Sequence, residues 1–392
     1  MTTSTAEFEQ IQAELTKGGV EAALNCLIDQ LREKKKHHEL FEALKMKARR
    51  DLGLPLTYSD AGDELDDATR TKLEDGLIEA CREVGMALLA EGQVRDGWMY
   101  LRPVGDRAAA AAEIAEVEVD EDNLEEIVEV TLHEGVDPVR GFGLVLEHFG
   151  TCNAITTFES SMHQHAKDVQ SGAAALLLEH LHQELVATVK ADIARQEGAE
   201  PKEDTLRELL ADRDWLFAEG AYHIDTTHLS STVRFARLLS DERLLRLALD
   251  LTEYGRRLTE QFQYQGEEPF TDHYPTHALY FQALLGENVE EALAYFRGQA
   301  ETVDLDQIGT IAVEVYIELL DRMGRSAEAI EAMLTMLPSD RRTLGVAPTL
   351  FELSRHAGDF NRAAEFYLQS ENLLGYATCL LSAQHAKANK GA

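Results

Sequence analysis

Apolar residues recur at helical spacing along most of this chain. Stretches with an apolar side chain every three or four positions predict amphipathic helices. A glycine between two such stretches predicts a turn, because glycine readily adopts the left-handed backbone that ends a helix. Around Gly324 the apolar positions are Val313, Tyr316, Ile317 and Leu320 on one side and Ile330, Met333 and Leu334 on the other.

One local pattern occurs at five places. A glycine is followed five or six residues later by a small residue, and four residues after that by a large apolar one. In a helical hairpin the small residue lets the second helix cross the first closely, and the large residue fills the space between them. The five copies are Gly18–Ala23–Leu27, Gly92–Gly97–Leu101, Gly286–Ala292–Phe296, Gly324–Ala329–Met333 and Gly358–Ala363–Tyr367.

This pattern resembles the second half of the tetratricopeptide-type (TPR-like) helical repeats, in which a small residue and then an aromatic one follow a turn. Gly286, Gly324 and Gly358 are spaced 38 and 34 residues apart, and the family repeats at about 34 residues. The resemblance spans residues 275–370 and, with fewer matches, residues 10–105. It implies an α-solenoid of helical hairpins with a concave groove.

The middle of the chain departs from the repeat pattern. Asp137 followed by Pro138 predicts the start of a helix, and residues 169–196, which contain no proline, predict one helix longer than a repeat helix. We therefore expect an all-α chain in three regions. They are an N-terminal helical-repeat region (1–110), an acidic linker and irregular helical middle region with a long helix (111–220), and a C-terminal TPR-like solenoid (221–392).

The composition narrows the classes of partner. The chain has 71 Asp and Glu against 37 Lys and Arg, a formal net charge of -34, which repels phosphate backbones and anionic membranes. Its four cysteines form no CxxC pair, and no segment reads as a secretory signal or a membrane helix. We expect an acidic cytoplasmic protein that binds neither nucleic acid nor membrane.

Two clusters of imidazole and carboxylate groups are the candidates for chemistry. One lies within residues 222–228 and the other within 272–277, each before or in the first turn of a predicted helix. Since first helices of successive repeats lie side by side, the clusters could together bind a divalent metal such as zinc or act as an acid–base pair. In the alternative, Asp225 or Thr226 and Asp272 cap helices and the histidines pack or donate to carbonyls. The candidate metal ligands are His223, Asp225, His228, Asp272 and His277.

No motif for dinucleotide, phosphate-loop, zincin or hydrolase chemistry occurs in the sequence. The favoured function is therefore a non-enzymatic one, binding of a peptide or protein in the groove, with no cofactor. A metal-binding protein or metal-dependent enzyme on the same scaffold is the alternative. Arg234 and Arg237 are three residues apart and could together hold a carboxylate. The candidate binding residues are Tyr222, His228, Arg234, Arg237, Tyr274 and His277.

Overall fold

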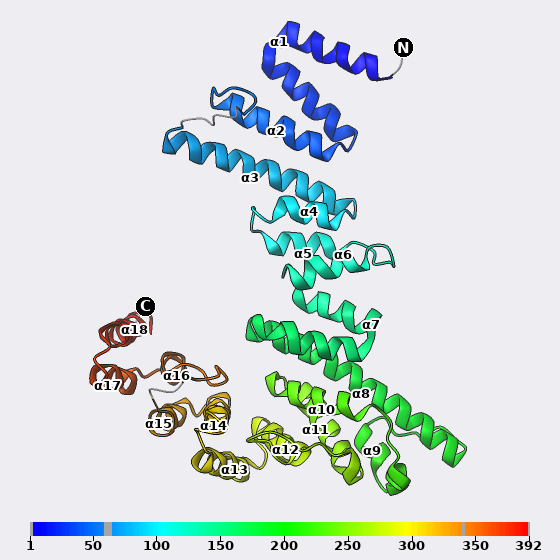
Figure 1. Ribbon diagram of the computed structural model, residues 1–392, viewed down its shortest axis with the longest axis vertical. Helices are drawn as coiled ribbons and strands as arrows, with labels where there is room; N and C mark the ends of the chain where they lie inside the picture. The colour runs from blue at the N-terminus through cyan, green and yellow to red at the C-terminus, as the bar shows by residue number, and fades with distance from the viewer. Residues whose placement is uncertain (1–2, 59–64, 339–341, 391–392) are drawn as a thin grey trace. The chain divides into compact units, whose positions relative to one another are not determined.

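The computed structural model describes residues 3–58, 65–338 and 342–390, and this part of the chain is all-α (Figure 1). Over these residues it contains no strand, only an isolated bridge between Gln265 and Asp272. The predicted all-α class is confirmed. Among the helices described, none is both long and apolar enough to cross a membrane.

The chain divides into two compact units, residues 1–150 and 151–392. The boundary falls inside the middle region expected at 111–220. It coincides with Gly150, whose backbone is left-handed (φ 82°) and interrupts the helix Pro138–Ser161. The two halves of that helix therefore belong to different units.

The first unit is a series of helices in which successive members pack on each other. Leu24, Ile28, Leu40, Val84 and Leu88 form one core cluster between α1, α2 and α3. The helices are α1 (Thr3–Glu33), α2 (His37–Asp51), α3 (Asp67–Ala90), α4 (Val94–Leu101), α5 (Arg107–Ala115), α6 (Leu124–Val128), a π-helical turn (Glu129–His133) and the first half of α7 (Pro138–Ser161).

The second unit is also built from helices that contact their neighbours in sequence. The predicted long helix is confirmed as α8 (Lys167–Glu197), whose buried face packs on α10, α11 and the turn η4. The remaining helices are α9 (Leu206–Leu210), α10 (Thr226–Phe235), η4 (Ala236–Leu238), α11 (Glu242–Arg257), α12 (His273–Leu284), α13 (Val289–Thr302), α14 (Ile311–Arg322), α15 (Ser326–Met336), α16 (Leu350–Ala357), α17 (Asn361–Gln369) and α18 (Leu373–Lys390), with short 3-10 turns at Met162–Gln164, Asp214–Gly220 and Glu260–Phe262.

The predicted hairpin turns are found at four of the five glycines. Gly92, Gly286, Gly324 and Gly358 have φ between 68° and 77° and end a helix. In the first copy the prediction is one residue off: Gly19, with φ 72°, makes the turn inside α1. Because Gly18 and Gly19 are adjacent, the sequence pattern does not show which of the two makes the turn.

All five small residues of the pattern are buried. Ala292, Ala329 and Ala363 are fully buried. At the crossing of α3 and α4, a Cβ added to Gly97 would lie 2.6 Å from Leu89 and 3.0 Å from the carbonyl oxygen of Gly85. These two helices approach closely because neither glycine carries a side chain.

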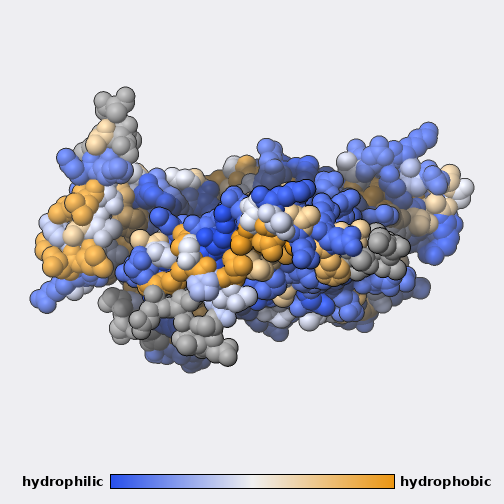
Figure 2. All heavy atoms as spheres, turned by 90° about the horizontal axis from the view of Figure 1, so that it is seen from above, coloured by the Kyte–Doolittle hydropathy of each residue, from blue (hydrophilic) through white to orange (hydrophobic). Residues whose placement is uncertain are grey.

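The C-terminal helices expose apolar side chains. Leu373 and Leu374 are 79% and 78% exposed, and Leu381 is 71% exposed. Apolar surface gathers on these helices at the left of Figure 2. Within the second unit, the alternate helices α10, α12 and α14 contact one another in turn, and residues of these three helices line two of the cavities described next.

Candidate functional site

Arg234 and Arg237 are placed by the short helix α10 and the 3-10 turn that follows it. Asp225 caps the start of α10, accepting hydrogen bonds from the backbone N–H groups of Thr227 (2.8 Å) and His228 (3.2 Å). Hydrogen bonds, first that from the Thr227 hydroxyl, lower the pKa of this carboxyl group. The cap therefore fixes the start of α10, which carries Arg234 and leads into the 3-10 turn that carries Arg237.

Arg237 is a cation without an acidic partner among the residues that the structure describes. Its Nε donates to the carbonyl of Arg234 (3.0 Å), and its guanidinium lies 4.7 Å from the centre of the Phe270 ring. Within the described part of the chain it forms no ion pair with a carboxylate. Burial lowers the pKa of the guanidinium. Arg234, in contrast, pairs with Glu159.

Arg237 lines a cavity of about 390 Å³ that we call the Lys167 cavity. Nζ of Lys167 donates to the carbonyl of Val346 (3.2 Å) and, like Arg237, pairs with no carboxylate among the described residues. Besides His163, three cationic residues and one anionic residue line the cavity. They are Lys167, Arg234, Arg237 and Glu318, and aromatic rings of Phe158, Phe235, Phe270 and Tyr280 complete much of the wall.

The single carboxylate of the cavity, Glu318, is held by the neighbouring helix. The Tyr280 hydroxyl donates to it at 3.2 Å, and Arg322 donates in turn to that hydroxyl, also at 3.2 Å. Burial raises the pKa of Glu318. Arg322 further donates to the carbonyls of Arg237 and Leu239, so it anchors the turn that carries Arg237.

A buried carboxylate, that of Glu314, accepts hydrogen bonds from the segment that forms one side of the same cavity. Glu314 is fully buried and accepts hydrogen bonds from the backbone N–H groups of Leu344 (2.7 Å) and Val346 (2.9 Å) and from the Thr310 hydroxyl (2.5 Å). Leu344, Gly345 and Val346 line the cavity. Hydrogen bonds from its backbone to a buried carboxylate therefore hold this segment.

A second cavity, about 400 Å³, shares Arg234, Arg237, Phe270 and Ile311 with the first. We call it the Glu268 cavity. Glu267 and Glu268 line it from the loop before α12, and Oε2 of Glu268 is buried without a hydrogen-bond partner. Other polar residues of its wall are Thr227, Ser230, Ser231, Tyr264, His273 and His277.

The two histidines of α12 are buried at this cavity. His273 Nε2 donates to the carbonyl of Ser230 (3.2 Å), and His277 Nδ1 donates to the carbonyl of His273 (2.6 Å). Burial lowers the pKa of His273 to about 4 and that of His277 well below its ordinary value. Nε2 of neutral His277 therefore carries a lone pair, and it has no partner.

The other candidate binding residues lie outside both cavities. The Tyr222 ring is exposed and contacts the Phe262 ring edge-on at 4.9 Å. Tyr274 is buried under α11, with its ring against Gly255, and its hydroxyl has no partner. His228 is half-buried in the first turn of α10.

The five candidate metal ligands are not gathered at one point. His223 is buried between Tyr254 (hydroxyl to Nδ1, 3.0 Å) and Asp192 (Oδ2 to Nε2, 3.2 Å). Asp225 serves as a cap, as the alternative interpretation supposed, and Asp272 occupies the N-cap position of α12 without a side-chain cap bond. No group of three or more His, Cys, Asp or Glu residues in the described ranges is arranged to hold a metal ion.

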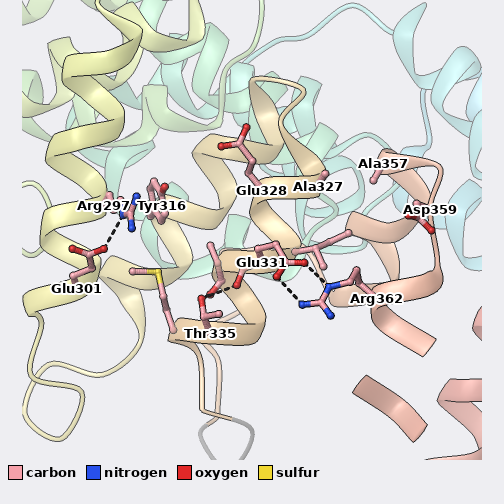
Figure 3. A pocket seen from close by; sticks show the side chains of 13 residues that line it. Arg297, Glu301, Tyr316, Ala327, Glu328, Glu331, Thr335, Ala357, Asp359 and Arg362 are labelled. Atoms are coloured by element: carbon pink, nitrogen blue, oxygen red, sulfur yellow. Dashed lines mark hydrogen bonds and ion pairs between the residues drawn. The ribbon is translucent and has the colours of Figure 1, made fainter. Parts of the chain in front are cut away.

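A third cavity, of about 500 Å³, lies along α13–α17 and differs from the other two in the pairing of its charged side chains (Figure 3). Its arginines are paired: Arg297 with Glu301 (2.7 Å) and Arg362 with Glu331 (2.5 Å). These pairs are exposed, so each contributes about 0–1 kcal/mol. The Lys167 cavity is smaller but holds two cations, Lys167 and Arg237, that pair with no carboxylate in the described ranges.

Sequence reasoning missed Lys167, Phe270, Tyr280 and Glu318. A signal for the last two was present, because Tyr280 lies six residues before Gly286 and Glu318 six before Gly324. In a helical-repeat fold, equivalent positions of neighbouring repeats face each other, and such a fold would predict this contact. Lys167 is distant in sequence and carries no such signal.

A scan against protein-family models and searches of curated proteins and of solved structures find no match to this chain.

Proposed function

We propose that this chain is a non-enzymatic, TPR-like helical-repeat protein that binds a peptide, and that the Lys167 cavity receives a carboxylate of that peptide. The glycine turns at repeat spacing and the facing residues Tyr280 and Glu318 support the repeat assignment. The peptide would lie in a concave groove formed by alternate helices, as the resemblance implies.

The unpaired charge of Arg237 carries the proposal. A half-buried guanidinium that bonds no carboxylate among the described residues has its charge less well compensated than an ion pair would provide, although the chain has an excess of carboxylates. A ligand carboxylate would supply that pairing, with Arg237 as a fork-shaped donor and Lys167 as a point charge. The Phe270 ring beneath the guanidinium holds its plane in place.

The test is selection from a random hexapeptide library with free C-terminal carboxylates, incubated with the full chain and analysed by mass spectrometry after gel filtration. We expect the co-eluting peptides to lose binding to Arg237→Met while keeping it to Arg256→Met. Arg256 is a suitable control because it is half-exposed, pairs with Glu253 and lines neither cavity. Retention of no peptide by the wild-type chain would refute the proposal.

A further inference from the structure

The Glu268 cavity differs in polarity from the Lys167 cavity beside it. Its two carboxylates, Glu267 and Glu268, offset the charge of the two arginines that both cavities share. The Lys167 cavity has a surplus of cations, whereas the Glu268 cavity adds acceptors. A ligand that spans both cavities therefore meets donors at one end and acceptors at the other.

Two acceptors of the Glu268 cavity are unsatisfied. Oε2 of Glu268 and Nε2 of His277 are both buried and have no hydrogen-bond partner among the residues that the structure describes, and His277 is only 2% exposed. Because Nδ1 of His277 is bonded to its own helix, Nε2 lies on the side of the ring away from that bond. Buried polar groups are ordinarily hydrogen-bonded, so a missing donor is the simplest account of both atoms.

We propose that the Glu268 cavity binds a primary ammonium group of the same peptide whose carboxylate enters the Lys167 cavity. An ammonium offers three N–H donors and a positive charge. It would donate to Glu268 and His277, while Glu267 contributes attraction across the cavity mouth. This inference rests on the proposed function and deepens it, by making the ligand a peptide with an acidic and an amino group close together.

Neighbouring residues of the Glu268 cavity are compatible with the binding of a small cationic group. The Thr227 hydroxyl donates to Asp225 (2.5 Å), which leaves its oxygen lone pairs available as acceptors. Gly266 lies in the loop that forms one wall, and a Cβ there would meet the carbonyl oxygen of Phe270 at 1.7 Å. The loop can therefore fold back against Phe270 only with glycine at that position.

The test repeats the hexapeptide selection with the full wild-type chain and with Glu267→Gln/Glu268→Gln. We expect the wild type to enrich peptides with a lysine or a free α-amino group, and the double variant to lose this preference while still requiring Arg237. For a recovered peptide, the double variant should raise Kd at least tenfold. Acetylation of the N-terminus and replacement of lysine by norleucine then show which amine is bound.

Each outcome separates the two proposals. Peptides that need Arg237 but show no preference for an amino group overturn the ammonium site and leave carboxylate binding intact. Retention of no peptide overturns both. If the double variant melts at a lower temperature, Glu268→Gln alone, an isosteric change, is measured in its place, and an unchanged amine preference there contradicts the inference.

Discussion

At the scale of residues, Arg237 bears on the stability of the fold as well as on the proposed binding of a carboxylate. Its half-buried guanidinium bonds no carboxylate among the described residues, so we expect Arg237→Met to stabilise the fold by up to about 1 kcal/mol. Methionine retains most of the volume and can pack on the Phe270 ring. Urea unfolding at pH 7 measures the change, with Arg256→Met as the control. A loss of stability would show that Arg237 is a structural cation and not one held ready for a ligand.

His273 and His277 make stability depend on pH. Both have a pKa lowered by burial, His273 from 6.5 to about 4, and Arg237 and Arg234 act in the same direction. The unfolded chain binds more protons below pH 6.5, so stability is complete above that value and falls as the pH drops towards 4. Each histidine contributes at most about 1.4 kcal/mol per pH unit in this window.

The check is urea unfolding at pH 7 and pH 5 for the wild type, for His273→Gln/His277→Gln and for His163→Gln. We expect the double variant to lose less stability than the wild type between the two pH values. His163 is exposed, so its replacement should leave the difference unchanged. Equal differences in all three proteins would mean that the two histidines are not buried as neutral groups.

At the scale of the elements, the closest helix crossing depends on glycine. Gly97→Val should destabilise the first unit by about 1–3 kcal/mol, because the new side chain would overlap Leu89 and the Gly85 carbonyl. Gly298→Ala in α13 is the matched control, since nothing lies within 4 Å of its Cβ position. It should stabilise α13 by about 0.5–1 kcal/mol. Thermal melts of both variants test these two expectations. Equal changes in melting temperature would contradict a close crossing of α3 and α4 at Gly97.

Glu314 accepts hydrogen bonds from the backbone of Leu344 and Val346, in the segment that lines the Lys167 cavity. In Glu314→Gln one carboxylate oxygen becomes an amide donor, which leaves at least one of the Leu344 and Val346 N–H groups without an acceptor. We expect faster hydrogen exchange at these two amides and a loss of about 1–3 kcal/mol. Exchange measured by mass spectrometry on peptides covering 342–349 provides the check. Unchanged protection would show that packing, and not Glu314, holds the segment.

The sequence predicted elements better than it predicted the site. Helical spacing located α8 to within two residues at its start, and four glycine turns fall where the pattern placed them, because both depend on local backbone preferences. Of the candidate binding residues, Arg234, Arg237 and His277 line the cavities. Lys167 and Glu268 could not be found, since their positions depend on which helices pack together.

At the scale of the whole molecule, the net charge of -34 opposes compactness. We expect the melting temperature at pH 7 to rise as NaCl increases from 20 to 500 mM, given a Debye length of about 3 Å at 1 M salt and about 10 Å at 0.1 M. Near the sequence pI of about 4.7 this rise should vanish. A melting temperature that falls with salt at pH 7 would mean that the surface ion pairs outweigh the repulsion.

The central claim is that the Lys167 cavity binds a peptide carboxylate. The most direct measurement is calorimetric titration of one recovered peptide, and of its analogue in which the bound carboxylate is an amide, into the wild type, Arg237→Met and Arg256→Met. We expect the amide analogue, and the Arg237→Met protein, each to weaken binding at least tenfold, with Arg256→Met unchanged. Equal affinities for acid and amide, or full affinity in Arg237→Met, would contradict the claim.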